Sequence, residues 1–317
     1  MSPSRKRPVH RFAHEAMATV FEIFVADREE AYAGQAAQAA FGEIDRIERL
    51  FSRFDPCSET SRIGRLKIGE TLPVGLETAE ILGLAAFVQA ETAGAFDINY
   101  RAGCAPARIR SMPPPPVLSG IIRIDRSGPG FEVTRLPARR GTKTPLIDLD
   151  LGAVGKGYAL DAALALLRDW GIGSVLFHAG TSTALAAGPG PGRGKEGEGW
   201  PVGAGSTAGK TSGPGRVLLR NRALSGSGTE VKGEHVVDPR TGRPASGHAA
   251  AWASHPSAAV ADALSTAFMV MTTAEVAGFC GRHPDVWALV KTGTEKCRIF
   301  NAGEIDGNRP AKRRSRR

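Results

Sequence analysis

The sequence has no long hydrophobic run, no cysteine pair and no apolar leader. No stretch of about 18 uninterrupted apolar residues occurs, so we expect no membrane span. The four cysteines stand singly without a CxxC spacing, which argues against a cysteine metal cluster and predicts free thiols in a reducing compartment. No apolar run follows the basic N-terminus, which argues against a secretory signal peptide or lipoprotein leader and favours the cytoplasm.

Positive charge is concentrated at the two ends of the chain. The 317 residues are 42% hydrophobic and 23% charged, an ordinary globular mixture, and the formal net charge is +9. Basic runs at chain ends are usually solvated tails, and no aromatic-interleaved basic stripe or helix-turn-helix spacing indicates nucleic acid as a partner. We predict a disordered basic tail over residues 1–12, a folded domain over 13–303 and a second basic tail over 304–317.

Hydrophobic periodicity predicts strands interleaved with long helices, hence an α/β or α+β protein. Loops are expected over residues 52–65 and 105–141, the latter exposed, with a turn at 128–130 between two short strands. Residues 188–215 read as an extended hairpin or a flexible surface insertion. The predicted strands are 18–26, 147–151, 174–178, 216–219, 249–254, 286–291 and 298–301, and the predicted helices are 29–50, 76–92, 157–170 and 259–272.

The first segment with chemical character is DLDLGAVGKGYALD, residues 148–161. Its glycines allow the backbone to approach a ligand closely, and the N-terminus of the helix that follows favours an anion. Lys156 adds a cation at the same place. The segment is neither a GxGxxG nor a P-loop, so tight packing of a strand on a helix explains it as well as phosphate binding does.

The second segment is ADALSTA, residues 261–267, on the last long helix. Asp262 and Thr266 are four residues apart and therefore lie on one helical face. A carboxylate and a hydroxyl are hard oxygen donors that suit Mg²⁺ shared with substrate phosphates. The alternative is structural: an acidic residue in the first turn favours the helix dipole, and a threonine can bond back to its own helix.

The third segment is EHVVDPRTGRP, residues 234–244. His235 precedes two β-branched residues and a turn, and histidine is the side chain that accepts a proton near neutral pH without a large pKa shift. The sequence leaves open whether His235 acts as a base or serves only as a structural residue at a strand edge.

Taken together and in order, these segments resemble the ApbE family, the FAD:protein FMN transferases. Three earlier stretches add to the resemblance: AMATVF at 16–21, FSRFDPCSETSRI at 51–63 and GAFDI at 94–98. The resemblance implies an α+β, T-fold-like architecture, with mixed sheets and helices around a central flavin-binding groove. It also implies transfer of FMN from FAD to a threonine hydroxyl of an acceptor protein, with release of AMP.

The resemblance also implies which residues form the site. Asp262 and Thr266 would supply side-chain oxygens to Mg²⁺, joined by the backbone oxygen of Ala153, and His235 would be the catalytic proton acceptor. The residues implied to line the FAD site are Met17, Phe54, Ala95, Phe96, Asp97, Asp150, Lys156 and Val236.

Some positions depart from the family pattern. Residues 178–188, HAGTSTALAAG, stand where many relatives have a Gly-Gly-Asp-Ile turn, so an acidic group is missing there. Ile63 and Gly64 replace the usual Leu-Asn, and Phe54 stands where the family often has tyrosine, so its ring keeps an aromatic face without the hydroxyl.

Three functions remain open from the sequence. The first is Mg²⁺-dependent transfer of FMN to protein threonine. The second is Mg²⁺-dependent hydrolysis of FAD to FMN and AMP in the same groove, with water as the nucleophile. The third is a non-catalytic flavin-binding or scaffold protein, against which the joint presence of Lys156, His235, Asp262 and Thr266 argues.

Overall fold

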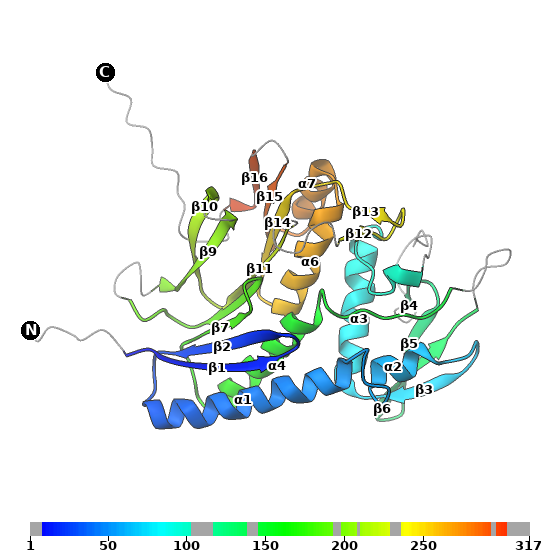
Figure 1. Cartoon of the computed structure of the whole chain (residues 1–317), viewed down its shortest axis with the longest axis horizontal. Coiled ribbons are helices and arrows are strands. Elements are labelled where there is room, and N and C mark those ends of the chain that lie inside the picture. The colour runs from blue at the N-terminus through cyan, green and yellow to red at the C-terminus, as the bar shows by residue number, and fades with distance from the viewer. Residues whose placement is uncertain are drawn as a thin grey trace, which may run out of the picture.

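Two antiparallel sheets lie at opposite ends of the molecule, with helix α3 (Leu76–Glu91) between them (Figure 1). This computed structural model describes residues 8–102, 117–137, 145–192, 198–207, 210–228, 236–292 and 296–302. Strands and helices form separate layers, as in α+β proteins, and the α+β class predicted from the sequence is confirmed.

The larger sheet has eight strands, and each neighbouring pair is antiparallel. In spatial order the strands are β1 (His10–Ala16), β2 (Thr19–Val25), β7 (Val175–Ala179), β8 (Thr183–Ala187), β11 (Arg222–Gly228), β14 (Ala250–His255), β15 (Trp287–Lys291) and β16 (Cys297–Phe300). Because β1 begins at His10, residues 10–12, which were predicted to belong to the N-terminal tail, are part of the sheet.

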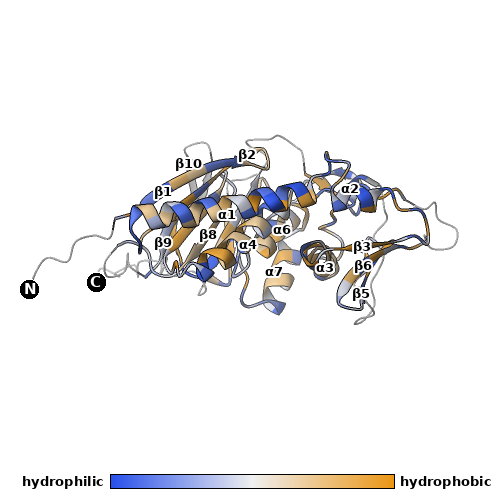
Figure 2. Ribbon diagram, turned by 90° about the horizontal axis from the view of Figure 1, so that it is seen from below, coloured by the Kyte–Doolittle hydropathy of each residue, from blue (hydrophilic) through white to orange (hydrophobic). Residues whose placement is uncertain are grey.

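Different elements cover the two faces of this sheet. Helices α1 (Glu30–Phe51), α4 (Gly155–Asp169) and α6 (Ala258–Val270) pack on one face, which carries Phe177 and Leu185. The hairpin of β9 (Trp200–Thr207) and β10 (Lys210–Leu219) packs on the other face, which carries Leu176 and Leu224. Figure 2 shows hydrophilic residues along the outer side of α1 and hydrophobic residues in the strands and helices behind it.

The smaller sheet has the strand order β3 (Thr71–Val74), β6 (Gly130–Arg135), β5 (Ile122–Ser127) and β4 (Val117–Leu118), and it packs on α3. The remaining elements are α2 (Glu59–Gly64), a short 3-10 helix (Tyr100–Ala102), α7 (Thr273–Arg282) and the small hairpin of β12 (Val237–Asp238) with β13 (Arg243–Pro244). The two short strands predicted around the turn at 128–130 are present as β5 and β6.

Several sequence predictions are wrong in detail. The predicted loop 52–65 contains α2, whose N-terminus is capped by Ser58 accepting the N–H of Ser61 at 3.0 Å. Residues 105–141 were expected to be exposed, but Ile122 and Val133 are fully buried under α3. The predicted strand 147–151 is irregular, because the Asp150 N–H donates to a single loop carbonyl, that of Ile98 (2.7 Å), rather than to a neighbouring strand.

Strands β8 and β11 and helix α7 were not predicted. Both strands are short and consist largely of Ala, Ser and Gly, and their residues are covered on both faces of the sheet. The alternation of polar and apolar residues that marks a half-exposed strand is therefore absent. Helix α7 begins directly after α6, at a capping box between Thr272 and Glu275. The hydrophobic periodicity gave no separate signal for this helix.

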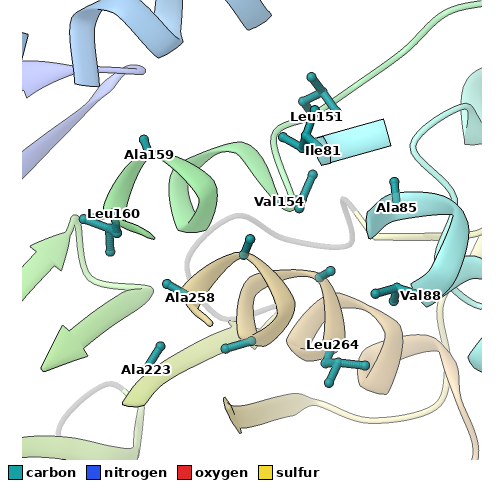
Figure 3. Close-up of a cluster of buried hydrophobic side chains, with 14 of the residues drawn as sticks. Ile81, Ala85, Val88, Leu151, Val154, Ala159, Leu160, Ala223, Ala258 and Leu264 are labelled. Carbon is teal, nitrogen blue, oxygen red and sulfur yellow. The ribbon is translucent and has the colours of Figure 1, made fainter. Parts of the chain in front are cut away.

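Helices α4 and α6 cross at an unusually close contact. A Cβ atom on Gly157 would lie 2.2 Å from the backbone oxygen of Ala258, so only glycine fits there. The carboxylate of Asp161, one turn further along α4, accepts the N–H groups of Ala258 (2.8 Å) and Ala259 (3.0 Å) at the N-terminus of α6. Figure 3 shows buried side chains of α3, the α4 region and α6 meeting around this crossing, among them Val88 and Leu264.

We predict that Gly157→Ala destabilises the protein by at least about 3 kcal/mol, because the added methyl group meets backbone atoms that cannot move independently of α6. The matched control is Gly42→Ala in α1, where a Cβ has nothing within 4 Å. The control should be neutral or stabilising by about 0.5–1 kcal/mol. Equilibrium denaturation of both variants measures the difference, and equal free energies of unfolding would contradict the prediction.

A buried histidine joins the end of α6 to the start of α7. His248 Nδ1 donates to the Phe268 carbonyl (2.6 Å), and Nε2 lies 3.0 Å from the Thr273 hydroxyl. Burial lowers the pKa of His248 below its usual value of 6.5. The unfolded chain therefore binds a proton that the folded protein does not, and stability must fall as the pH drops through 6.5.

We predict that His248→Gln loses less stability than the wild type between pH 7.5 and pH 5. The difference should grow by up to about 1.4 kcal/mol per pH unit below pH 6.5, the limit for one proton. Burial also lowers the pKa values of His178 and His255, but both residues remain in the variant and their contribution cancels. Urea denaturation at each pH measures the effect, and parallel stability curves would exclude this role of His248.

Candidate active site at the crossing of α4 and α6

The N-terminus of α4 and the first turns of α6 bring a cation and a carboxylate together. Lys156 Nζ lies 3.3 Å from Asp262 Oδ2 and 2.8 Å from the carbonyl oxygen of Gly152. The Gly157 N–H also points at Asp262 Oδ2, at 3.3 Å. Asp262 is only 4% exposed, so its charge is balanced by the ammonium group and by oriented donors rather than by bulk water.

Hydroxyl groups surround Asp262 on its sheet side. Its Oδ1 accepts the hydroxyls of Thr183 (3.0 Å, from β8) and Ser225 (2.9 Å, from β11). Its backbone oxygen accepts the hydroxyl of Ser265 at 2.9 Å and that of Thr266 at 3.4 Å. Oδ2, facing Lys156, is the carboxylate oxygen on the α4 side.

The three residues proposed as metal ligands fit a hard cation by their chemistry. Asp262 offers a carboxylate, Thr266 a hydroxyl and Ala153 a backbone carbonyl, all oxygen donors of the kind that Mg²⁺ prefers. In the described part of the chain no backbone N–H donates to the Ala153 oxygen, because the Gly157 N–H is directed to Asp262. No group of three or more His, Cys, Asp or Glu side chains suited to a metal occurs among the described residues, so a cation here needs further oxygen atoms from a substrate.

Asp150 belongs to the same cluster through the loop before α4. Its Oδ1 accepts the Gly152 N–H at 2.9 Å, and its Oδ2 lies 3.0 Å from an Arg101 nitrogen and 3.3 Å from the Tyr100 hydroxyl. Asp150 therefore anchors the loop before α4 to the short 3-10 helix Tyr100–Ala102. The same loop carries the Gly152 carbonyl that accepts from Lys156. Asp150 thus shapes the cluster by holding this loop.

Asp97 lies near the smaller sheet and bonds to protein groups. Its Oδ1 accepts the Asn99 N–H and the Ser119 hydroxyl, both at 2.7 Å. Burial raises the pKa of the Asp97 carboxyl, and these hydrogen bonds oppose the rise. Ala95 and Phe96 are buried at 1% and 2% exposure, so their side chains belong to the core.

Phe54 projects from the surface beside a polar hollow. Its side chain is 82% exposed, and the Arg53 guanidinium lies 4.6 Å from the centre of its ring. The hollow, about 310 Å³, lies between the loop and helix around α2 and residues 147–149, with Arg65 and Asp148 among its lining residues. Residues 147–149 lead directly into Asp150, so Phe54 flanks the same stretch of chain that carries the cluster at α4.

Met17 occupies the turn between β1 and β2. Met17 and Ala18 have φ values of 49° and 56°, the left-handed pair of a tight hairpin that usually contains Gly or Asn. The Met17 N–H donates to the Glu48 carboxylate of α1 at 2.8 Å, which fixes the turn. The tip of this hairpin adjoins the turn between β7 and β8, where the Gly180 N–H bonds to the carbonyl of Val20 (2.9 Å).

His235 lies outside the described residues, and Val236 is the first residue described after that gap. The Val236 carbonyl accepts the Ala245 N–H at 2.8 Å. The turn that follows is held by Arg240, which forms an ion pair with Asp238 (3.0 Å) and reaches Glu275 of α7 (2.8 Å). Arg240 thus braces the Asp-Pro-Arg turn.

Comparisons with known proteins identify the family of this chain. The model of the ApbE family matches residues 17–290. The chain belongs to the ApbE family. A FAD:protein FMN transferase of Salmonella typhimurium is 25% identical over 284 residues, covering 82% of this chain and 77% of that protein. The resemblance found in the sequence is therefore confirmed.

Solved structures of ApbE proteins have the same fold. The apo form of the Pseudomonas stutzeri flavinyl transferase ApbE aligns with a TM-score of 0.71 at 20% identity, covering 96% of this chain and 99% of that one. The ApbE protein of Thermotoga maritima aligns with a TM-score of 0.73 at 22% identity, covering 94% and 98%. The described part of the present ApbE chain contains no helix with the length and hydrophobicity that a membrane crossing requires.

The sequence reading missed the hydroxyl groups that contact Asp262. Thr183 lies within the segment noted only for lacking the family's acidic residue, and Ser225 lies in a segment interpreted as turns. The one available signal was the alternation Ser225-Gly226-Ser227, which places two hydroxyls on one face of a strand. Without knowledge of the strand pairing, that signal does not indicate what the hydroxyls face.

Proposed function

We propose that this ApbE protein is an Mg²⁺-dependent transferase that moves FMN from FAD to a threonine hydroxyl of an acceptor protein and releases AMP. The observation that carries the proposal is the meeting of Lys156 and the Asp262–Thr266 face at the N-terminus of α4. Cleavage of a diphosphate needs its charge neutralised, and a cation beside hard oxygen donors at a helix N-terminus supplies that environment. The family and the name of the Salmonella typhimurium relative support the same chemistry.

We assign the binding of the diphosphate, the metal and the aromatic ring of the substrate to different residues of the site. Lys156 and the N-terminus of α4 attract and orient the diphosphate, while Asp262, Thr266 and the Ala153 carbonyl hold the metal. Bound Mg²⁺ supplies Lewis-acid stabilisation of the charge that develops on the phosphoryl oxygens. Asp150 keeps the loop before α4 in place, and the exposed ring of Phe54 offers an aromatic face to a planar ring of the substrate.

The proposal assigns two further groups of residues. His235 is the base that takes the proton of the attacking hydroxyl, which a side chain with a pKa near neutrality can do. Met17, Asp97 and Val236 are assigned to the FAD site, and Ala95 and Phe96, whose side chains are buried, are assigned to it through their backbone. The partners are therefore FAD and a protein that presents a threonine.

We predict that Asp262→Asn abolishes metal-dependent cleavage of FAD, because it removes the charged ligand among the proposed metal donors while keeping the size of the side chain. Cleavage is measured with FAD and Mg²⁺, with and without EDTA. The matched control is Asp125→Asn on β5, whose carboxylate pairs with Arg123 in the smaller sheet. The control should retain wild-type rate, and an Asp262→Asn rate that equals wild type and still responds to EDTA would refute the metal assignment.

We predict that His235→Ala binds FAD within a few-fold of wild type and transfers FMN at least about a hundredfold more slowly, since a positioned base contributes about 10²–10⁴-fold in rate. Mass spectrometry of the acceptor, FAD affinity and melting temperature are measured on one preparation. His283→Ala, which removes a half-buried histidine bonded to Glu91, is the control and should not change the rate.

The outcomes of this experiment separate the functions left open by the sequence. Normal transfer by a stable His235→Ala variant would remove the base assignment, and joint loss of stability and FAD binding would make His235 structural. A wild-type protein that releases free FMN and AMP without labelling any acceptor peptide would be a hydrolase.

A further inference from the structure

A pair of buried hydroxyl groups faces Asp262 from the large sheet. Thr183 and Ser225 are direct partners in the antiparallel pairing of β8 and β11, so the register of the sheet places them side by side. Their oxygens are 3.1 Å apart, and the residues are 2% and 0% exposed. Both side chains lie on the sheet face that α6 covers, which also carries the buried Leu185 and Ala223.

The hydrogen bonds of this pair converge on one atom. Each hydroxyl has a single hydrogen to donate, and both oxygens lie within 3.0 Å of Asp262 Oδ1. Hydrogen bonds to a carboxylate are stronger than those between neutral groups, which fixes the direction of the donors. Oδ1 is thereby committed to the sheet, and rotation about the bond to the carboxyl group is restrained.

The consequence appears at the other carboxylate oxygen. With Oδ1 held by Thr183 and Ser225, Oδ2 is directed toward Lys156 Nζ and the Gly157 N–H. A carboxylate on a helix surface alone would have several side-chain rotamers, whereas this one is clamped between a sheet and a second helix. Ser227, two residues along β11, extends the same row and contacts Ser265 (2.9 Å).

We propose that Thr183 and Ser225 are positioning residues that orient Asp262 for metal binding, an assignment that rests on the proposed function. Groups that hold a metal ligand in place from behind typically contribute 10- to 100-fold in metal affinity or activity.

The test measures metal affinity directly. Mn²⁺ is titrated into wild type, Thr183→Val and Ser225→Ala in the presence of saturating FAD, with free Mn²⁺ followed by electron paramagnetic resonance, and melting temperatures are recorded without metal. We expect both variants to weaken Mn²⁺ binding about 10- to 100-fold. Thr183→Val preserves the shape of the side chain, and Thr183→Ser, which restores the hydroxyl, should recover wild-type affinity.

The matched control is Ser254→Ala on the neighbouring strand β14. Ser254 is equally buried, and its hydroxyl donates to the Ala223 carbonyl at 2.6 Å without touching Asp262. It should lose stability with no change in Mn²⁺ affinity. Wild-type affinity in Thr183→Val and Ser225→Ala, or an equal loss in Ser254→Ala, would overturn the assignment alone. A wild-type protein that binds no Mn²⁺ with FAD would instead overturn the proposed function, and the assignment with it.

Discussion

The close crossing of α4 and α6 is the contact on which the candidate site depends. Gly157 lets the backbones of the two helices touch, and Asp161 caps the N-terminus of α6 from α4. Both interactions lie within two turns of Lys156, so they fix the position of the α4 backbone that carries Lys156 against the α6 backbone that carries Asp262. Such a frame holds a reactive geometry with little reorganisation when a substrate binds.

Burial of Asp262 explains why so many polar groups gather at this crossing. An ionised carboxylate removed from water is destabilised unless donors and a counter-charge replace its hydration. Lys156 provides the charge from α4, and hydroxyls of β8 and β11 provide donors from the sheet. The site therefore joins α4, α6 and the large sheet. A change in the pairing of β8 with β11 would alter the surroundings of Asp262 on α6.

Much of this arrangement follows from local sequence signals. The long helices α1, α3, α4 and α6 were all predicted from the sequence, and the Gly94 N–H, which bonds to the Gln89 carbonyl at 2.8 Å, closes the C-terminus of α3. The separation of four residues between Asp262 and Thr266 places both side chains on one face of α6. Strands β8 and β11 were not predicted, because strands that consist of small residues and lie in a sheet covered on both faces show no alternation of polar and apolar residues.

By itself the sequence determined the family, the α+β class and the residue types that can bind a metal and a diphosphate, since these depend on residue order and on spacing within single elements. Only the tertiary structure decided which of those residues meet. Lys156 and Asp262 are 106 positions apart, and Thr183 and Ser225 approach Asp262 from separate strands. Contacts of that range are set by strand register and helix packing, in which each position depends on many distant residues at once, so no local spacing encodes them.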